Sequence, residues 1–382
     1  MEPLFSLPED YQALRESVRS LAEKKIAPFA KEVDEDARYP QEAHDALQSA
    51  GLAAAHVPTE YGGDGADALA VAIIIEEVAR VCGASSLIPA VNKLGSWPLI
   101  LAGNDDQKKR WLPELARGRG FSYCLSESES GSDSVAMKTK AIYESGNWVL
   151  SGSKKWISNA GVSDFYTVLA VTDPAARSKG ITAFVVEKSD PGVSFGAHEK
   201  KMGMRGSPTR EVYFDGVVLD ESRVLGKVGE GFGIAMRTLD HTRITIAAQA
   251  LGLAQGALEV ATNYAKERKQ FGKPIFEFQA VQFMLADMAM QIEAARGLTY
   301  QAAVKSERDE SDLTFFSAAS KCFATDVAMK VTTDAVQVLG GYGYVNDYPV
   351  ERMMRDAKLT QIYEGTNQIQ RLVMARHLDK LI

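Results

Sequence analysis

The sequence contains little cysteine and little histidine. It has three cysteines, Cys82, Cys124 and Cys322, and five histidines among 382 residues. The cysteines are scattered and offer no disulfide framework, so they favour a reducing compartment, and we expect a cytoplasmic protein. No two histidines lie close together in the sequence, and no cysteine lies near a histidine at the spacing that is typical of metal ligands. We therefore predict no metal site.

Positive charge and long apolar runs are also lacking. The formal net charge of −7 argues against a nucleic-acid-binding surface and against a polybasic membrane patch. No apolar run approaches the roughly 18–20 residues of a spanning helix, so we expect no membrane span. Residues 1–10 lack the basic-then-apolar order of a secretion signal. A hydrophobic content of 46% is typical of an ordinary globular protein, here long enough for two or three packed units.

Three zones differ in their sequence pattern, and they predict an α+β multi-domain protein. Residues 1–118 show helical periodicity, which predicts an N-terminal α-helical domain. Residues 119–228 change to short alternating or β-branched segments, which predicts a middle domain built as a small β-barrel or sandwich. Residues 229–382 hold only two prolines within long amphipathic stretches, which predicts an antiparallel helical bundle. The lack of βαβ alternation argues against a nicotinamide-type Rossmann fold.

Several individual elements can be predicted within these zones. In the middle zone, a turn at 144–147 between two apolar segments predicts a hairpin over 141–150. The three isoleucines at 73–75 predict a helix buried on several sides. The remaining predicted strands are 165–171, 181–186 and 210–214, and the predicted long helices are 244–268, 279–307 and 313–339.

The most informative segment is residues 361–371, near the end of the sequence. It places Glu364 in a break between two helical runs, beside Gly365 and ahead of Thr366. The residues that follow repeat at helical spacing, so we predict that Thr366 caps a new helix. Backbone N–H groups in such a break lack helical partners and can point at a bound oxygen. A carboxylate beside free amide donors is what proton abstraction next to a carbonyl requires.

Two segments of the middle zone allow both a functional and a structural interpretation. Residues 123–133 open into a hydroxyl- and glycine-rich loop that can present donors to a ring carbonyl and to phosphates, or form a solvated turn. In residues 155–161, Trp156 leads a hydroxyl-amide-glycine turn that suits stacking on a flat ring, or it is an ordinary core tryptophan.

Three segments of the last zone are ambiguous in the same way. In residues 267–272, the Arg268 guanidinium can bind a phosphate group, or it can simply stabilise the C-terminus of a helix through the helix dipole. The glycines within 337–344 permit close backbone approach to a ligand, or only cap and turn a helix. Residues 239–243 are either part of a site or ordinary surface charges on a helix.

Taken together and in this order, the segments resemble the acyl-CoA dehydrogenase family over essentially the whole chain. The family patterns Y-C-(L/V)-(T/S)-E-P-x-A-G-S-D, K-x-W-I-(T/S)-N, R-x-x-F-G, Q-(I/V)-x-G-G-x-G and Y-E-G-T-x-Q-I-Q-R all have counterparts here. The chain departs from the first pattern at Ser128, which replaces the proline, and at Glu129, which replaces a small residue. Because a carboxylate beside a pyrophosphate is unfavourable, we expect Glu129 to face solvent.

The resemblance implies a three-domain fold with a C-terminal four-helix bundle, and FAD bound non-covalently between the β domain and the bundle. The adjacent subunit would complete the cofactor site, which implies an obligate dimer, usually within a dimer of dimers. The flavin, pyrophosphate and adenosine contacts implied within one protomer are Leu125, Ser126, Ser132, Trp156, Ser158, Thr366 and Gln368. The cofactor contacts implied on the bundle, which reach the neighbouring protomer, are Arg268, Gln270, Phe271, Phe278, Gln337, Gly340 and Gly341.

The resemblance also implies a reaction, in which Glu364 removes the α-proton of an acyl-CoA while the β-hydrogen leaves as hydride to flavin N5. The product would be a trans-2-enoyl-CoA, and the electrons would pass to an electron-transferring flavoprotein. In one branch of the family the base is a glutamate at the position of Thr242, so here Glu364 is the single candidate by this comparison. The substrate contacts implied are Ser132, Asp240, Arg243, Tyr363, Gly365 and Arg376.

Two alternatives stay open beside a dehydrogenase. An acyl-CoA oxidase would return the electrons to O₂, although such enzymes are usually much longer. A non-catalytic acyl-CoA- or flavin-binding protein would have no use for Glu364. The acyl group is expected to be short to medium and straight, and residues 88–94 are expected to help form the pocket floor.

Overall fold

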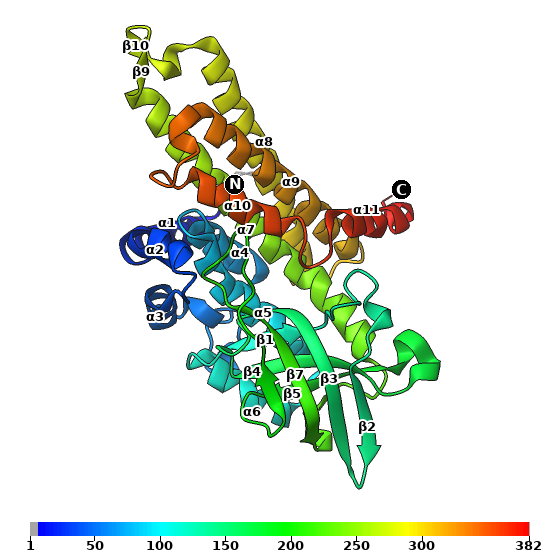
Figure 1. Cartoon of the computed structure of the whole chain (residues 1–382). Coiled ribbons are helices and arrows are strands. Elements are labelled where there is room, and N and C mark those ends of the chain that lie inside the picture. Colours follow the sequence, from blue (N-terminus) through cyan, green and yellow to red (C-terminus); the bar gives the residue numbers. More distant parts are fainter. Residues whose placement is uncertain (1–6, 382) are drawn as a thin grey trace.

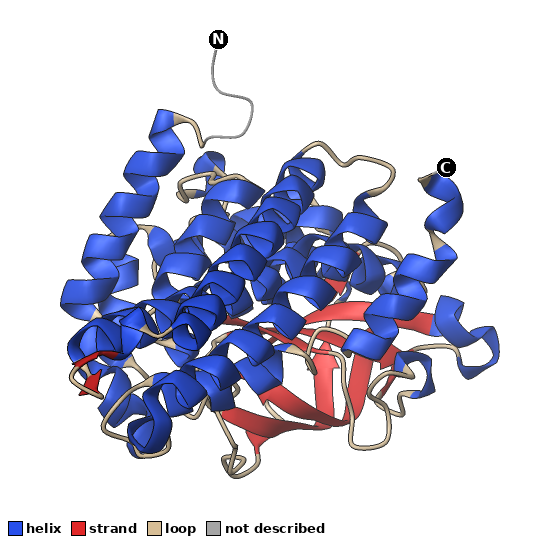
Figure 2. Cartoon of the chain, turned by 90° about the horizontal axis from the view of Figure 1, so that it is seen from above, coloured by secondary structure: helices blue, strands red, loops and turns tan. Residues whose placement is uncertain are grey.

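The chain folds as helices, then a sheet, then helices (Figure 1). The computed structural model describes residues 7–381; residues 1–6, part of the segment on which the expectation of no secretion signal depends, lie outside the described residues. The predicted α+β class with an N-terminal helical domain, a middle sheet domain and a C-terminal helical domain is confirmed. In Figure 2 the strands gather at one side of the molecule and the helices fill the rest.

In the N-terminal domain, α1 and α5 pack against α4, which is buried along almost its whole length, as its isoleucines predicted. The sequence analysis did not predict α5, a helix with Pro89 and Pro98 inside it that packs against both α7 and β1. Prolines usually end helices, which is why α5 was difficult to predict. The helices are α1 (Glu9–Lys25), α2 (Ala30–Glu35), α3 (Gln41–Ser49), α4 (Ala68–Ala79), α5 (Gly83–Ala102) and α6 (Asp105–Ala116).

The middle strands form one mixed sheet in the order β6-β7-β3-β2-β4-β5-β8, with β1 pairing with β4 in parallel. The predicted hairpin is present, and Tyr143 pairs with Trp148 across it. Although β3 and β5 are not neighbours in the sheet, the rings of Trp148 and Phe184 lie 5.7 Å apart, so the sheet curls around a core of its own. The strands are β1 (Phe121–Cys124), β2 (Lys140–Glu144), β3 (Asn147–Ser158), β4 (Phe165–Val171), β5 (Ile181–Glu187), β6 (Val193–Phe195), β7 (Thr209–Leu219) and β8 (Val224–Leu225).

The two faces of β4 belong to different cores. Tyr166 and Val168 point into the core enclosed by the curled sheet. Phe165 and Leu169 point the other way, into a cluster that includes Trp111 of α6. Side chains alternate along a strand, so a strand that is apolar on both faces fits between two apolar layers. The sheet is thereby attached to the N-terminal helices.

The C-terminal helices surround α7, the longest helix of the described chain. It begins at Gly231, whereas the sequence predicted a start at 244. By length and composition α7 could cross a membrane, contrary to the expectation from sequence, but 78% of that apolar window is buried inside the protein. It is therefore the central core helix. The helices are α7 (Gly231–Glu267), α8 (Gln279–Glu307), α9 (Leu313–Leu339), α10 (Val350–Thr360) and α11 (Asn367–Arg376), with a small hairpin of β9 (Lys269–Gln270) and β10 (Lys273–Pro274) between α7 and α8.

Candidate active site

Glu364 lies in the turn between α10 and α11, as predicted. Thr366 is the N-cap of α11, and its hydroxyl accepts a hydrogen bond of 3.3 Å from the Ile369 N–H. Glu364 has a φ of +52° and Gly365 a φ of +90°. A left-handed backbone is unusual for a residue with a side chain and costs roughly 1–3 kcal/mol, so such a residue persists only where its surroundings hold it.

Two side chains from outside the turn hold its backbone. Lys321 of α9 donates to the Gly365 carbonyl at 2.8 Å and to Asn367 Oδ1 at 2.8 Å. Gln370 of α11 donates to the carbonyls of Glu364 at 3.0 Å and Gly365 at 2.9 Å. A Cβ at Gly365 would lie 2.6 Å from Gln370 Nε2, so this glycine also makes room for the contact. These bonds go to main-chain carbonyls and to the Asn367 side chain, so none of them engages the Glu364 carboxylate.

The Glu364 carboxylate is half-buried and contacts α7. Thr242 Oγ1 donates to Glu364 Oε2 at 2.8 Å. Burial raises the pKa of Glu364 to about 7, although the Thr242 hydroxyl and the charges of Arg243 and Lys321 act in the opposite direction. A carboxylate with a pKa near neutrality is ionised in a useful fraction and is still basic enough to take a proton.

The backbone beside this carboxylate also offers a donor. The Glu364 N–H makes no hydrogen bond within residues 7–381. A free amide N–H next to a base can stabilise negative charge on an oxygen while the base removes a proton from the neighbouring carbon. The predicted combination of a base with an open donor is therefore present.

Positions 242 and 364 are in direct contact, although they are far apart in sequence. The branch of the resembled family that carries its base at position 242 and the branch that carries it at position 364 would therefore deliver a carboxylate to the same place. In this chain Thr242 holds the carboxylate instead of supplying it. The sequence prediction that one acid serves this site agrees with that geometry.

Two further predicted substrate contacts lie on α7, one turn apart. Arg243 Nη1 donates to Asp240 Oδ1 at 2.6 Å, and Thr314 Oγ1 donates to the other Asp240 oxygen at 2.8 Å. Burial lowers the pKa of Arg243, and its Nε has no partner in the described chain. The interpretation of this segment as surface charge is thus wrong for Arg243, which is 4% exposed. Arg376 is exposed near the end of α11.

Tyr363 precedes the base and fixes the turn to two other helices. Its hydroxyl donates to Gln249 Oε1 of α7, and Gln249 Nε2 donates to Ser86 Oγ of α5 at 2.7 Å. Burial raises the pKa of Tyr363 well above its usual value, so the hydroxyl stays protonated. The turn with Glu364 is in this way connected to α5, α7, α9 and α11.

The loop after β1 is anchored by a buried ion pair. Lys154 Nζ of β3 lies 2.7 Å from Glu127 Oε1, and the other oxygen accepts from the Lys138 N–H at 2.6 Å. Both side chains are nearly inaccessible, at 0% and 8%. Leu125 and Ser126 before the anchor are half-buried, and Ser132 beyond it is exposed.

Glu129, the departure from the family pattern, behaves as expected. Its side chain is 73% exposed and pairs with Lys138, which is 75% exposed. The expectation that Glu129 faces solvent is confirmed, so it places no carboxylate in the interior of the loop.

Trp156 is a second residue with a left-handed backbone. It has a φ of +64° and is 56% exposed, at a bulge where the pairing of β3 with β7 shifts between Lys154 and Ile157. The Lys155 N–H donates to the Ser126 carbonyl at 2.9 Å, which joins this bulge to the loop after β1. A large aromatic ring left uncovered by the fold is an incomplete contact, and a flat ring of a ligand suits it. The interpretation of Trp156 as a core residue is therefore wrong. Ser158, two residues on, is half-buried.

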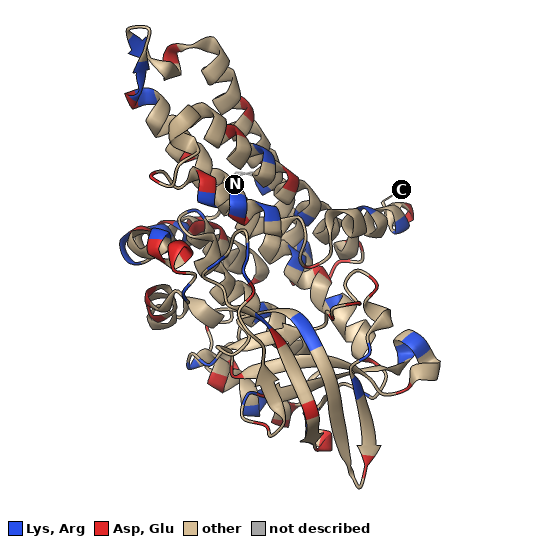
Figure 3. Ribbon diagram, viewed as in Figure 1, with Lys and Arg blue, Asp and Glu red and all other residues tan. Residues whose placement is uncertain are grey.

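The remaining predicted cofactor residues lie at the far tip of the bundle. The Arg268 guanidinium lies over the Tyr342 ring at 5.4 Å, and the rings of Phe271 and Phe278 are 6.0 Å apart. Phe271 is 95% exposed, and Gln270, Gln337, Gly340 and Gly341 are exposed too. Figure 1 shows this tip, marked by β9 and β10, far from the sheet and from α11. Figure 3 shows basic residues gathered there. Within one chain, the predicted cofactor residues at this tip therefore lie apart from the predicted cofactor residues of the β domain.

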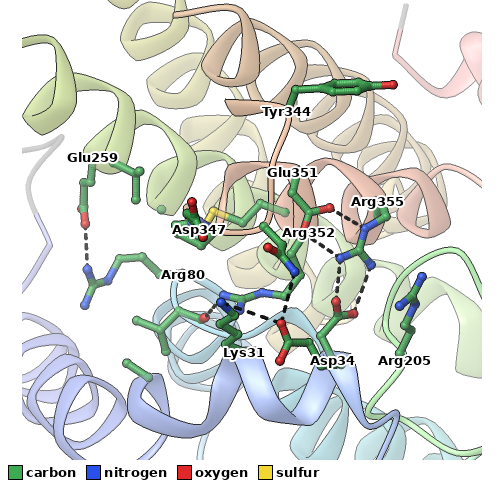
Figure 4. Close-up of a pocket in the computed structure, with 18 of the residues that line it drawn as sticks. Lys31, Asp34, Arg80, Arg205, Glu259, Tyr344, Asp347, Glu351, Arg352 and Arg355 are labelled. Atoms are coloured by element: carbon green, nitrogen blue, oxygen red, sulfur yellow. Dashed lines mark hydrogen bonds and ion pairs between the residues drawn. The ribbon is translucent and has the colours of Figure 1, made fainter. Parts of the chain in front are cut away.

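Two cavities differ in their relation to the site. One of 460 Å³ is lined by Thr366 and Gln368, both predicted to contact the dinucleotide, and by Arg371. Another, of 590 Å³, lies between α2, α7, α10 and the segment 344–349 (Figure 4). Arg355 pairs there with Asp34 at 2.6 Å, and none of the predicted site residues lines that second cavity.

The comparisons with known proteins agree with this arrangement. Three family models match consecutive parts of the chain: the acyl-CoA dehydrogenase N-terminal domain at residues 8–119, the middle domain at 122–217 and the C-terminal domain at 229–378. The fold and the site thus define an FAD-dependent flavoprotein oxidoreductase. The chain belongs to the acyl-CoA dehydrogenase family.

Relatives cover almost the whole chain. The probable acyl-CoA dehydrogenase FadE25 of Mycobacterium tuberculosis is 59% identical over 98% of this chain and 97% of its own length. The structure of butyryl-CoA dehydrogenase from Megasphaera elsdenii matches with a TM-score of 0.95 and 42% identity, covering 98% of this chain and 99% of that one. A chain from a structure described as the electron transferring flavoprotein of Acidaminococcus fermentans matches with a TM-score of 0.95 and 45% identity, covering 98% and 99%.

Sequence reasoning missed the residues that hold the turn, above all Lys321 and Gln370. Lys321 lies within a long amphipathic helix where a lysine has no special meaning, and Gln370 is one of several polar residues in α11. No spacing rule connects either residue to Glu364, because the contacts form only when α9, α10 and α11 pack together.

We predict that Lys321→Met lowers kcat by about 10- to 100-fold while FAD stays bound, because the Gly365 carbonyl loses its donor and the base shifts from its position. Lys330→Met is the matched control, since Lys330 is exposed on the same helix. Steady-state kinetics and the flavin absorbance per chain measure both effects. Unchanged kcat in Lys321→Met would show that Gln370 alone holds the turn.

We predict that Glu127→Gln destabilises the protein by about 3–5 kcal/mol, because it leaves the buried Lys154 ammonium without its partner. Urea unfolding followed by circular dichroism measures this loss. Glu129→Gln, which affects an exposed pair, should leave the urea concentration at the unfolding midpoint almost unchanged. Similar losses in the two variants would contradict an anchoring role for Glu127.

Proposed function

We propose that this acyl-CoA dehydrogenase oxidises the Cα–Cβ bond of a short- to medium-chain acyl-CoA, with Glu364 as the base that removes the α-proton. The observation that carries the proposal is the half-buried Glu364 carboxylate, held by Thr242, with its own unpartnered N–H beside it. The butyryl-CoA dehydrogenase relative supports the chain length. The product is a trans-2-enoyl-CoA.

The chain's own residues divide the work between proton removal and charge stabilisation. Glu364 takes the proton, and its N–H donates to the thioester oxygen as negative charge develops there. A general base contributes about 10²–10⁴-fold, and one donor of the oxyanion type about 10²–10³-fold. When bound, FAD supplies the acceptor for the β-hydride.

The residues of the β domain fit FAD. The exposed Trp156 ring and the half-buried Leu125 and Ser126 would face the flavin, and the backbone bond between Lys155 and Ser126 keeps them together. Ser132, Ser158, Thr366 and Gln368 would complete the contacts from the same chain. These side chains would also exclude water from the carboxylate, which keeps its pKa high.

A second copy of the chain would supply the exposed tip with Arg268, Gln270 and Phe271, so we propose a homo-oligomer built from dimers. The electron acceptor is proposed to be an electron-transferring flavoprotein, and the similarity to a chain in the structure of the Acidaminococcus fermentans electron transferring flavoprotein supports this. The three cysteines are free and buried, which supports a cytoplasmic location.

Mixing the FAD-loaded protein with butyryl-CoA under argon tests the proposal. We expect the flavin absorbance near 450 nm to bleach, and we expect Glu364→Gln to bind FAD normally but to lose about 10²–10⁴-fold in the rate of bleaching. Near-normal bleaching by Glu364→Gln would mean that another group is the base.

The same experiment separates the two alternatives. Formation of H₂O₂ with substrate turnover on re-aeration would indicate an oxidase. Absence of bleaching with every acyl-CoA tested would indicate a binding protein. Reoxidation by an electron-transferring flavoprotein without H₂O₂ is the expected result.

The pH dependence follows from the raised pKa of Glu364. Because the base must be ionised, kcat/KM should fall about tenfold per unit below a pH of about 7, the pKa of the free enzyme. The free energy of unfolding should change with pH in the opposite direction to kcat/KM. A carboxyl group whose pKa is raised by folding destabilises the fold increasingly as pH rises from its unfolded value of 4.5 to about 7.

Glu364→Gln should therefore be more stable than the original protein above pH 7, and the difference should vanish below about pH 4.5. Thermal unfolding at several pH values measures it. A profile of kcat/KM that stays flat down to pH 5 would contradict the predicted ionisation.

A further inference from the structure

Lys93 of α5 is a buried cation without a partner. Its side chain is 2% exposed, and its Nζ lies over the Trp97 ring, 4.8 Å from the ring centroid. Within residues 7–381, Lys93 Nζ makes no hydrogen bond and no ion pair. Two other buried lysines near the site differ in this respect, because Lys154 pairs with Glu127 and Lys321 donates to Gly365. Buried charges are normally paired, so Lys93 calls for an explanation.

The carboxylates that interact with Lys93 are occupied elsewhere. Asp67, the N-cap of α4, accepts from the Ala70 N–H at 2.7 Å and from the Tyr11 hydroxyl. Glu307, at the end of α8, accepts from the Ala68 N–H at 3.2 Å. Glu364 accepts from Thr242. All three carboxylates favour the charged form of Lys93, yet none lies within 4.0 Å of its ammonium.

The remaining titratable neighbours carry no negative charge. His56 bonds to Ser96 Oγ at 2.8 Å, and His241 of α7 bonds to Ser306 Oγ at 2.8 Å. Burial lowers the pKa of His56 to about 3 and that of His241 to about 4, so both rings are neutral. Burial lowers the pKa of Lys93 only to about 8, so it remains protonated at neutral pH.

Three other buried polar atoms, on α5, β1 and α7, lack hydrogen-bond partners in the described part of the chain. They are Trp97 Nε1, Tyr123 Oη and Thr238 Oγ1. Trp97 lies one turn after Lys93, and its ring centroid is 5.2 Å from that of His241. Burial raises the pKa of Tyr123 of β1, and the Glu364 carboxylate raises it further, so the two groups interact. Thr238 lies one turn before Thr242 on α7. These groups can all donate, and together with the ammonium they favour a ligand with acceptor oxygens.

We propose that Lys93 binds an anionic oxygen on the acyl group of the substrate, so that this enzyme prefers acyl-CoA thioesters whose acyl chain carries a carboxylate. The inference rests on the proposed function, and it specifies the substrate class of that same site. The sequence predicts that residues 88–94 of α5 help form the floor of the acyl pocket, together with helices of the C-terminal domain, and Lys93 is the charged residue of that segment. An incoming carboxylate would supply the missing partner of the ammonium and accept from its neighbouring donors.

Binding to a protein that cannot turn over tests the inference separately from the reaction. The FAD-loaded Glu364→Gln protein is titrated by calorimetry with glutaryl-CoA and with pentanoyl-CoA, which have the same number of acyl carbons. Succinyl-CoA and butyryl-CoA are compared in the same way, which tests a carboxylate on a shorter acyl chain. We expect tighter binding of the carboxylated thioester. Adding Lys93→Met to the Glu364→Gln protein should weaken the binding of glutaryl-CoA or succinyl-CoA about 10- to 100-fold, because the substitution removes a hydrogen bond to a charged group.

The Kd of the uncharged thioesters should change by less than about threefold in Lys93→Met. Lys93→Arg should retain most of the preference for carboxylated over uncharged thioesters. Lys201→Met is the control for loss of a partly buried lysine. It should leave the ratio of binding constants for carboxylated and uncharged thioesters unchanged. Flavin content and circular dichroism establish that each variant is folded. If Lys93→Met does not fold, the comparison between the parent protein and Lys93→Arg provides the answer.

Three results would overturn the inference. An equal loss for charged and uncharged thioesters would place Lys93 on the CoA portion. Unchanged binding would show that Lys93 is structural. A parent protein that binds pentanoyl-CoA and butyryl-CoA better than their carboxylated counterparts would exclude the proposed preference. If no acyl-CoA is oxidised by the unsubstituted protein, the proposed function fails, but the binding ratios still decide the role of Lys93.

Discussion

Glu364 sits in a left-handed backbone conformation that is tolerable only because its neighbours hold the turn. Lys321 and Gln370 donate to the carbonyls of the turn, and Thr366 starts α11 directly after it. Three helices must pack together before these bonds exist, so the position of the base depends on the packing of the whole bundle. The benefit is that the carboxylate and the N–H of the same residue both remain available. A helix would have tied up that N–H, and an unsupported loop would have let the carboxylate turn into water.

The electrostatics of the site balance two opposing requirements. Removing Glu364 from water raises its pKa toward neutrality, which makes it a stronger base. Too much burial would leave it protonated and inactive at neutral pH. The Thr242 hydroxyl and the cations Arg243, Lys321 and Lys93 lower the pKa again, so it settles near 7. The site therefore accepts some instability in the empty protein, because a half-buried carboxylate without substrate is an unfavourable feature of the fold.

The sequence predicted what depends on local chemistry. The Thr366 cap, the break at Glu364 and the hairpin ending at Tyr143 and Trp148 all follow from neighbouring residues, and each is present. Regular helices such as α8 and α9 were also predictable from periodicity.

The features that escaped prediction depend on tertiary packing. The start of α7 at Gly231 and the whole of α5 were missed, because glycine and proline are poor helix formers and only burial between other elements compensates for them. The burial of Lys93 was missed for a related reason. Nothing in a sequence distinguishes a lysine on the inner face of a helix from one on the surface until the neighbouring helices are in place.

The described chain holds one set of predicted cofactor residues in the β domain and the turn region, and another set at a distant tip. Trp156 is 56% exposed on β3 of the middle sheet, and Phe271 is 95% exposed in the β9–β10 hairpin, which Figure 1 shows far from that sheet. Exposed rings of this size are unfavourable in water unless something covers them. No bending of one chain brings the tip to Trp156, because α7 and α8 are long helices packed along their length against α9. The proposed homo-oligomer would cover these rings with a second copy of the chain. In that assembly the basic tip of one copy would add cations to the groove of the other copy, which Thr366, Gln368 and Arg371 line. The packing that holds Glu364 in place therefore also keeps the two sets of predicted cofactor residues apart within one chain.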